Sequence, residues 1–555
     1  MREKGILSGV RVLDLTRMLS GPYSTMVLAD HGAEVIKIED SKGDTSRFNG
    51  PYGAHDIEKK WAGYFVSLNR NKKSVQLDLK SETGKKNFFS LVVTANILIE
   101  NFRPGVMERL GLSYETLKKV NPRLVYGAIR GFGDPRSGKS PYMNWPSYDV
   151  VAQAMGGVIN LTGESSKSLT KVGPGIGDIF SGLFLSFGVV AALREAEATG
   201  EGQFVDIAMY DAMISLCERA VYQYHMEGKI PTTSGNFHPF LAPFGIFPCK
   251  DGQVAIGVVE DRFWKELVER IGTLEFLENP EFSTLLARKK NILVVNKIVA
   301  QWTSEFSKKQ LAERLGGVVP FGPVNNIEDI INDPHTLARK MISSIDNPNI
   351  DGEPWLVASN PLNFDQSPKP VMESPPQLGE HNNQYLSDEV NALLSGEFKL
   401  NLRKAFGSFT TGVTIVTTLQ ADGIPRGFTA NSFTSVSLEP PLLLVCLSKK
   451  ALSYETFTNS DHFAINVLRE DQENTSQLFA TQSEEKFMST AWDSGQKSMP
   501  ILKECLANFV CHKERIVDAG DHTILIGRVT DFNFNEGKPL LYFRGGYVND
   551  LYDKL

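Results

Sequence analysis

The stretch LSGVRVLDLTRMLSGPYSTMVLADHGAEVIKIE, residues 7–39, decides the fold of the first part of the chain. An apolar run from Val10 to Leu15 favours a strand, and a Gly-Pro pair then interrupts the pattern. An amphipathic helix is expected to about His31, and a second strand from Glu34 to Glu39. This order of elements predicts a βαβ unit, whose two strands run parallel.

Two later apolar runs extend this pattern, at Ile97 to Phe102 and at Leu124 to Phe132, with helical patterns between them. Strands that alternate with helices predict a parallel sheet covered on both faces. We therefore expect a doubly wound, Rossmann-like α/β domain over about residues 1–225 and 340–395. No G-x-G-x-x-G sequence follows the first strand, so this half is not expected to bind NAD.

The pattern changes near Gly235. The segment GNFHPFLAPFGIFPCKDGQVAIGVV, residues 235–259, places a Lys-Asp-Gly turn between two strands. It predicts a smaller α/β domain over about residues 230–335. From Asp346 to Pro376 prolines are dense, which favours extended chain that connects two bodies.

After Asn391 the chain consists of short β-branched runs separated by turn residues. Examples are TGVTIVTT at 411–418, HFAINVL at 462–468 and HTILIGRVTDFNF at 522–534. Such spacing predicts a mainly antiparallel barrel or sandwich. We expect the boundary between about residues 390 and 400, with a first domain of residues 1–395 and a second of residues 399–555.

Bulk composition limits the classes of function. At 555 residues the chain is too long for one hydrophobic core, and 41% hydrophobic with 22% charged residues is ordinary for globular domains. A net charge of −7 without any basic run argues against a nucleic-acid partner. No apolar leader precedes the first strand, and the longest apolar run, Ile179 to Leu193, is shorter than the ~20 residues that span a bilayer. We expect a cytoplasmic protein without a membrane partner.

The five cysteines are scattered without a C-x-x-C pair, and the nine histidines are equally dispersed. This distribution is typical of reduced thiols rather than of a disulfide framework or a zinc site. We expect no metal site.

The first 390 residues or so resemble the class III CoA-transferase family, of the CaiB/BaiF type. The segments that carry the resemblance, besides residues 7–39, are NRNKKSVQLDLK at 69–80, ILIENFRPGVMERLG at 97–111, SYDVVAQAMGG at 147–157, FGIFPCKDGQVAIG at 244–257, GPVNNIEDIINDPH at 322–335 and PPQLGEHN at 375–382. The resemblance implies transfer of CoA from an acyl-CoA to a small carboxylic acid by an interlocked homodimer.

In that family an aspartate in a small-residue turn before a long helix attacks the thioester. The resemblance places it at Asp178, in GPGIGDIFSGL at 173–183. A carboxylate that attacks a thioester gives a mixed anhydride, and the released thiolate can return to form an enzyme-bound CoA thioester. Gly175 and Gly177 would allow close approach and leave backbone N–H groups free for an oxyanion. From the local sequence alone, an ordinary helix cap is the competing interpretation.

CoA carries phosphate groups, so its site needs cations and N–H donors. For each basic residue alone, a solvated surface charge is the alternative. The resemblance assigns CoA contacts to Leu19, Ser20, Asn69, Lys72, Asn101, Phe102, Arg103 and Arg109.

Two positions depart from the oxalate-handling members of the family. Leu19 stands where they carry glutamine, and Asp40 stands where they carry arginine, which argues against an oxalate or formyl substrate. The acyl-CoA racemases of the same superfamily typically carry a Gly-His-Asp run where this chain has Ser147-Tyr148-Asp149. An acyl-CoA racemase or isomerase is therefore the weaker, alternative function.

The second domain resembles the short-chain flavin reductases, which have an FMN-binding split barrel. The matching segments are RKAFGSFTTGVTIVTT at 403–418, GFTANSFTSVSLEPPLLLVCLS at 427–448, AGDHTILIGRV at 519–529 and PLLYFRGGY at 539–547. Without the resemblance, such serines and threonines commonly satisfy the backbone of turns. The resemblance assigns the flavin site to Thr429, Ala430, Asn431, Ser432, Ser435, Val436, Ser437, Cys446, Ser448 and Ser453, and the nicotinamide site to His522.

The implied reaction is the reduction of FMN or FAD by NADH or NADPH, in which the barrel orients the two rings. The reduced flavin would serve a separate flavin-dependent monooxygenase. A flavin-binding sensor or dimerisation module without turnover is the alternative. The whole chain is thus predicted to be a bifunctional homodimer.

Overall fold

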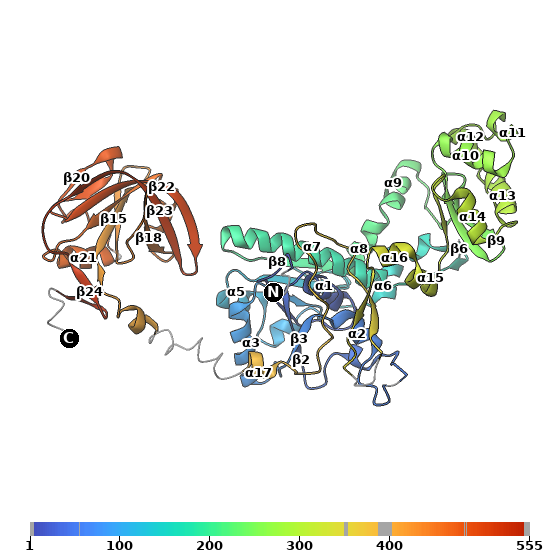
Figure 1. Ribbon diagram of the computed structural model, residues 1–555. Helices are drawn as coiled ribbons and strands as arrows, with labels where there is room; N and C mark the ends of the chain where they lie inside the picture. The colour runs from blue at the N-terminus through green and yellow to red at the C-terminus, as the bar shows by residue number, and fades with distance from the viewer. Residues whose placement is uncertain are drawn as a thin grey trace. The chain divides into compact units, whose positions relative to one another are not determined.

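The computed structural model describes residues 5–54, 56–348, 353–386, 402–481, 483 and 486–548. The chain divides into two units, residues 1–391 and 392–555, which are described separately (Figure 1). The boundary expected between residues 390 and 400 lies outside the described residues.

A six-stranded sheet forms the centre of the first unit, in the order β3-β2-β1-β4-β5-β8, with every pairing parallel. The predicted parallel sheet is confirmed, and β2 has the predicted bounds. The strands are β1 (Arg11–Asp14), β2 (Glu34–Glu39), β3 (Lys72–Gln76), β4 (Ile97–Glu100), β5 (Val125–Arg130) and β8 (Phe204–Ala208).

Side chains of these strands alternate between two apolar faces. Val12 and Val125 point into a core with α1 and α7, whereas Leu13 and Tyr126 point into a core with α3 and α5. A sheet buried on both faces is the doubly wound arrangement that the sequence predicts. The helices are α1 (Ser20–Ala29), α2 (Gly63–Asn69), α3 (Glu82–Thr94), α4 (Val106–Arg109), α5 (Tyr114–Val120), α6 (Asp149–Met155), α7 (Ile176–Thr199), α8 (Met209–Leu216) and α9 (Glu218–Glu227), with 3-10 turns at Thr45–Phe48 and Ile159–Leu161 and a short hairpin of β6 (Gly163–Ser165) and β7 (Ser168–Leu169).

The long helix α7 contains the apolar run noted in the sequence. Among the described residues it is the one helix whose length and composition would allow it to cross a membrane. It packs against α1, β5 and β8, and this contact buries Leu185 and Val189 completely. Gly182 permits the close approach of α1, because a Cβ there would lie 2.5 Å from the carbonyl oxygen of Ser20. One face of α7 is thus packed in the core of the first unit.

A smaller antiparallel sheet, in the order β11-β10-β9, has a core of its own. Phe247, Trp264, Val295 and Leu311 are buried in it. The predicted Lys-Asp-Gly turn joins β9 to β10. The elements are β9 (Phe244–Cys249), β10 (Gly252–Gly257), β11 (Phe321–Pro323), α10 (Asp261–Ile271), α11 (Glu275–Glu278), α12 (Leu285–Lys290), α13 (Ile292–Thr303) and α14 (Lys308–Leu315).

After this body the chain returns to the edge of the large sheet. Gly379 donates its N–H to Ser74 Oγ at 3.0 Å, and Tyr385 donates its hydroxyl to the Glu34 carboxylate at 2.6 Å. These bonds fix the end of the first unit on β2 and β3. The elements of the return are α15 (Ile327–Asn332), α16 (Pro334–Ala338), β12 (Ile342–Ile345), β13 (Trp355–Ala358) and α17 (Asn382–Tyr385).

The second unit contains a seven-stranded sheet in the order β16-β15-β19-β22-β23-β18-β17, with every pairing antiparallel, as the sequence predicts. Its core buries Val445, Phe463 and Ile465. The elements are β14 (Thr411–Gly412), β15 (Thr414–Leu419), β16 (Pro425–Ala430), β17 (Thr434–Leu438), β18 (Pro441–Ser448), α20 (Tyr454–Asn459), β19 (His462–Val467), α21 (Glu473–Ala480), β20 (Trp492–Ser494), a 3-10 turn (Gln496–Ser498), β21 (Pro500–Leu502), β22 (Ala507–Ala519), β23 (His522–Phe534), β24 (Leu541–Phe543) and β25 (Gly546–Val548).

Candidate functional sites

Two loops that carry predicted CoA residues leave the same edge of the parallel sheet. β1 lies between β2 and β4, so the strand order reverses there and the loops after β1 and β4 diverge. In doubly wound sheets such a switch point is the usual place of a ligand crevice. Ser20 on the loop after β1 lies 3.5 Å from the amide of Asn101 on the loop after β4. Leu19 is on the first of these loops, and Phe102 and Arg103 are on the second.

Side chains from neighbouring elements hold the loop after β1. The Asn101 amide donates to the carbonyl oxygen of Arg17 at 2.8 Å and accepts from its N–H at 2.9 Å. The Asp44 carboxylate accepts from the N–H of Met18 at 3.2 Å. Met18 has φ 68°, in the left-handed region that a methionine rarely adopts. Asn101 therefore positions the loop, and its amide is already engaged.

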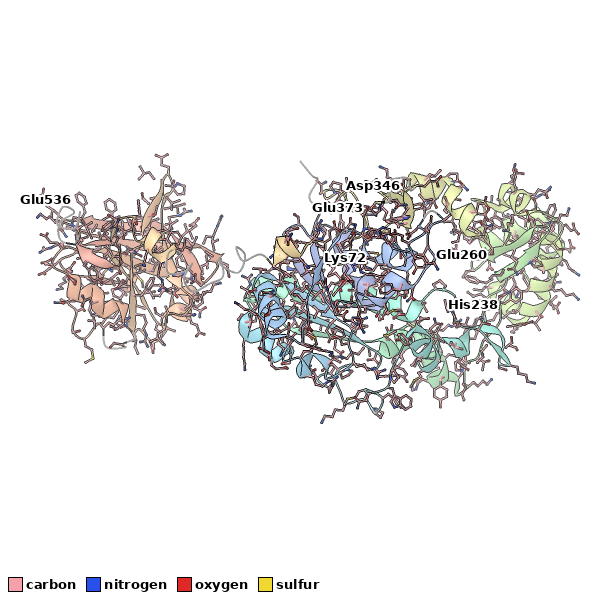
Figure 2. The ribbon with its side chains drawn as sticks, turned by 90° about the horizontal axis from the view of Figure 1, so that it is seen from below. Lys72, His238, Glu260, Asp346, Glu373 and Glu536 are labelled. Carbon is pink, nitrogen blue, oxygen red and sulfur yellow. The ribbon has the colours of Figure 1, made fainter. Side chains whose placement is uncertain are left out.

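Lys72 and Asn69 lie in the interior rather than in an open crevice. The Lys72 ammonium donates to Asp14 Oδ2 at 3.0 Å, to Asn69 Oδ1 at 3.0 Å and to the carbonyl oxygen of Pro22 at 3.1 Å. The side chains of Lys72 and Asp14 are fully buried, and Figure 2 shows Lys72 inside the α/β body. We expected these two side chains to contact CoA, but in this structure they are not open to a CoA phosphate. The Lys72 ammonium instead pairs with the buried carboxylate of Asp14, which requires a cation.

Asp178 lies in the first turn of α7 and not in a turn before the helix. The N-cap is Gly175, so the interpretation of Asp178 as the helix cap does not hold. The Asp178 carboxylate accepts a hydrogen bond from Ser20. A Cβ on Gly175 would lie 2.8 Å from Leu19 Cδ2. The loop after β1 and the start of α7 therefore form one site.

A second carboxylate, Asp149 at the start of α6, belongs to this site. Burial first and the Asp149 carboxylate second raise the pKa of Asp178 to about 7, against the hydrogen bond from Ser20. Asp149 Oδ1 accepts a hydrogen bond from the N–H of Gly177 at 2.8 Å. The sequence analysis expected this N–H to be free for an oxyanion, and in this structure it is not. Sequence reasoning did not assign Asp149 to the site. The one available signal was its place in the Ser-Tyr-Asp segment.

Cations surround the switch point. The Arg17 guanidinium pairs with Asp40 at 2.7 Å and lies 5.8 Å over the ring of Phe102. Arg103 and Arg109 are exposed, and neither pairs with a carboxylate among the residues that the structure describes. The two arginines therefore remain available to an anionic ligand.

A cavity of about 580 Å³ opens in the second unit beside β16, β18, α20 and α21. Ser432 Oγ accepts from the N–H of Cys446 at 2.9 Å, which joins the end of β16 to β18. The His522 Nδ1 atom lies 2.8 Å from Asp521 Oδ1. Eight residues assigned from the sequence line this cavity, namely Thr429, Ala430, Asn431, Ser432, Cys446, Ser448, Ser453 and His522.

Three assigned residues do not lie at this cavity. Ser435, Val436 and Ser437 are on β17, the last strand of the sheet, and Val436 is exposed. The register between β17 and β18 shifts between Ser435 and Ser437, which alters the alternation of side chains. These three residues do not line the cavity, and their assignment to the flavin site stays a prediction.

Three cations that the sequence analysis missed line the same cavity: Arg426, Lys450 and Lys486. The Lys486 ammonium donates to the carbonyl oxygens of Phe479 at 2.9 Å and Gly427 at 3.2 Å. Burial and the Arg426 guanidinium lower the pKa of Lys486. No sequence signal identified Lys486, because it lies outside the recognised segments beside acidic residues.

Residues 7–382 match CoA-transferase family III, and residues 406–549 match the flavin reductase like domain. A succinyl-CoA:mesaconate CoA-transferase of Haloarcula hispanica is 42% identical over 385 residues, which cover 69% of this chain and 96% of that protein. A succinate–glutarate CoA-transferase of Agrobacterium fabrum is 34% identical over 390 residues, which cover 70% and 96%.

Among solved structures, a CAIB/BAIF family protein from Brucella suis superimposes with a TM-score of 0.61 at 33% identity, covering 70% of this chain and 100% of that chain. These matches agree with the parallel-sheet α/β fold of the first unit. The chain belongs to CoA-transferase family III and carries a flavin reductase like domain behind the transferase region.

Proposed function

We propose that the first unit moves CoA between carboxylic acids through covalent intermediates on Asp178. The observation that carries this proposal is a half-buried carboxylate in the first turn of α7, where Gly175 lies against Leu19 of the loop after β1 and Asp149 accepts the N–H of Gly177. The ionised Asp178 oxygen attacks the thioester carbonyl and the C–S bond breaks. The CoA thiolate departs, and Asp178 is left as a mixed anhydride with the acyl group. The thiolate then attacks the aspartyl carbonyl, which releases the first acid and leaves an aspartyl-CoA thioester.

The second half of the reaction reverses these steps with another acid. The acceptor carboxylate attacks the aspartyl-CoA thioester and displaces the thiolate, which then attacks the acyl carbon of the new anhydride. The products are a new acyl-CoA and free Asp178. Arg103 and Arg109 would hold CoA by its phosphate groups. The named relatives act on succinyl-CoA and short dicarboxylic acids, so we propose short dicarboxylic acids as substrates here.

The pH dependence of adduct formation reports on the neighbours of Asp178. The reactive form is the ionised carboxylate, so the rate should rise with pH to a plateau, with a midpoint near the pKa of about 7. Asp149→Asn removes a repelling charge and should move the midpoint to lower pH. Ser20→Ala removes a hydrogen bond to the charged form and should move it to higher pH. The measurement is single-turnover adduct formation by intact mass between pH 5 and 9.

The two variants serve as controls for each other, because a general loss of structure would not move the midpoints in opposite directions. If both variants kept the wild-type midpoint, Asp178 would not be the titrating group. If both moved it in the same direction, the assigned roles of Ser20 and Asp149 would be wrong.

Racemisation is the alternative for the first unit. It needs an acid and a base at the carbon next to the thioester, and the segment at Asp149 supplies a carboxylate without a histidine. Exchange of the α-proton with deuterated solvent, in the absence of any adduct, would favour the racemase over the transferase.

We propose that the second unit reduces FMN or FAD with NADH or NADPH. A bound flavin would accept the hydride of the nicotinamide. The cavity fits such a group, because Arg426, Lys450 and Lys486 supply positive charge for phosphate, and His522 lies at the same cavity for the nicotinamide. Contacts between β16 and β18 support a split barrel. The reduced flavin would serve a separate monooxygenase. If the protein purifies with bound flavin but does not oxidise NADH or NADPH, a flavin-binding sensor would be favoured instead.

Lys486→Met should weaken flavin binding at least about tenfold, because one charged contact to phosphate contributes roughly 1.5–3 kcal/mol. Lys486→Arg, which keeps the charge, should bind nearly as the wild type does. Lys503, paired with Asp493 on the surface of the same unit, offers a matched control as Lys503→Met. The measurement is quenching of flavin fluorescence on titration, and equal affinity in the Lys486→Met and Lys503→Met variants would remove Lys486 from the site.

The proposal includes a homodimer in a reducing compartment such as the cytoplasm. Leu183, Phe184 and Phe187 of α7 are exposed, and Phe187 is 75% exposed. They contribute to an almost wholly apolar cavity of about 670 Å³. Apolar patches of this kind commonly mark subunit contacts. The five cysteines are all unpaired, which supports a compartment that keeps thiols reduced.

A further inference from the structure

A second cavity of the first unit, of about 570 Å³, lies between the start of α9 and the small sheet. The proposed transfer on Asp178 assigns no role to it. Arg219 and His238 are its two basic side chains, and His238, labelled in Figure 2, lies on the segment that leads from α9 to β9. Neither residue was singled out in the sequence.

The hydrogen bonds of His238 place two donors face to face. Its Nδ1 atom accepts the N–H of Phe240 at 3.1 Å, so in the neutral ring the proton is on Nε2. That Nε2–H lies 3.5 Å from Nη1 of Arg219, which is also a donor. Burial and the Arg219 guanidinium lower the pKa of His238, which favours the neutral ring. Two facing donors need an acceptor oxygen between them.

No protein carboxylate supplies that oxygen among the residues that the structure describes. The residues that line the cavity include no aspartate or glutamate. Arg219 forms no ion pair within the described part of the chain, and His238 is its one side-chain partner there. The cavity therefore has an uncompensated positive charge, and partly buried arginines usually pair with an anion.

Apart from Ser234 and Asn236, the rest of the wall is mostly apolar and is shaped by glycine. Phe237, Ile246 and Phe321 line it. Gly245 is required, because a Cβ there would lie 2.4 Å from the carbonyl oxygen of Asn236. Gly322 lines the cavity with nothing within 4 Å of where its Cβ would be, so a larger side chain there would enter open space. A ligand with an anionic head and a carbon chain would match this lining.

We infer that this cavity binds a small carboxylic acid, whose carboxylate bridges Arg219 and His238 while its carbon chain lies against the apolar wall. The role of the cavity rests on the proposed function: it would select the acid to which CoA is transferred. A carboxylate matches the planar guanidinium with two parallel hydrogen bonds. A nucleotide phosphate is the other source of an anion, and the apolar wall favours the acid.

The test is calorimetric titration of the full-length protein with succinate and, separately, with adenosine 3′,5′-bisphosphate, which carries the phosphates of CoA. All variants are made in the Asp178→Asn background, so no covalent chemistry contributes to the heat. We expect Arg219→Met and Gly322→Val to weaken succinate binding at least tenfold, and to leave the bisphosphate affinity within twofold. Arg270→Met, an exposed arginine of α10, is the matched control and should bind as the parent does.

The inference is overturned if succinate binds equally to the parent, Arg219→Met and Gly322→Val, or if the two variants weaken the bisphosphate instead. Binding is measured without turnover, so the succinate affinities can be interpreted even if the covalent mechanism on Asp178 proves wrong. In the wild-type background the same two substitutions should raise the KM for the acceptor acid at least tenfold with kcat within about twofold. A lowered kcat with unchanged KM would also contradict the inference.

Discussion

Replacement of Asp178 by asparagine should abolish covalent adducts and lower kcat/KM for CoA transfer by more than about 10⁴-fold, as loss of a nucleophile does in other covalent enzymes. The amide keeps the size of the side chain and can still accept the hydrogen bond from Ser20. It cannot form an anhydride with an acyl group. Intact-mass analysis after incubation with succinyl-CoA, with hydroxylamine to trap activated acyl groups, measures the effect.

A matched control for this result is Asp211→Asn. Asp211 also lies in the first turn of a helix, α8, and burial raises its pKa as well. This variant should still form the adduct, because Asp211 is not assigned to the carboxylate site. An adduct that persists in Asp178→Asn and disappears in Asp211→Asn would move the nucleophile to α8.

The regular part of the fold could be predicted from local patterns. The strand at Glu34–Glu39 is found as predicted, because the β-branched residues Val35, Ile36 and Ile38 favour a strand. The Lys-Asp-Gly sequence at residues 250–252 identified the turn between β9 and β10. The ends of β4 and β5 were placed too far along the chain, because apolar residues continue beyond the last sheet hydrogen bonds. Boundaries depend on pairing, which local composition does not report.

The candidate sites were predictable only where one segment carries the chemistry. Asp178 could be named as the candidate nucleophile because its own segment resembles a family motif. The hydrogen bond of the Gly177 N–H could not be predicted, since its acceptor Asp149 lies on another helix. Lys72 shows the same limit, because its charge suggests an anion ligand while its contacts with Asp14 and Asn69 bury it. Such relations exist only once the chain has folded.

Lys72→Met is the second substitution with a large expected effect, on stability rather than chemistry. Burial alone would raise the pKa of Asp14, but the ammonium groups of Lys72 and Lys37 hold it well below its usual range. Without Lys72, the Asp14 carboxylate stays buried with one cation fewer, and removing one partner of a buried pair costs about 3–5 kcal/mol. Calorimetric unfolding should show a lower transition temperature for the first unit.

The neighbouring residue provides the control that separates burial from charge. Lys73 pairs with Glu373 at 2.9 Å, and its side chain is 29% exposed, so Lys73→Met should cost less than about 1 kcal/mol. The double variant Asp14→Asn with Lys72→Met should be more stable than Lys72→Met alone, because it no longer buries an unpaired carboxylate. Equal losses for Lys72→Met and Lys73→Met would contradict the buried pair. If the double variant were less stable than Lys72→Met, Lys37 alone would be sufficient to pair with Asp14. Lys72 would then stabilise mainly the first turn of α1, through its hydrogen bond to the carbonyl oxygen of Pro22.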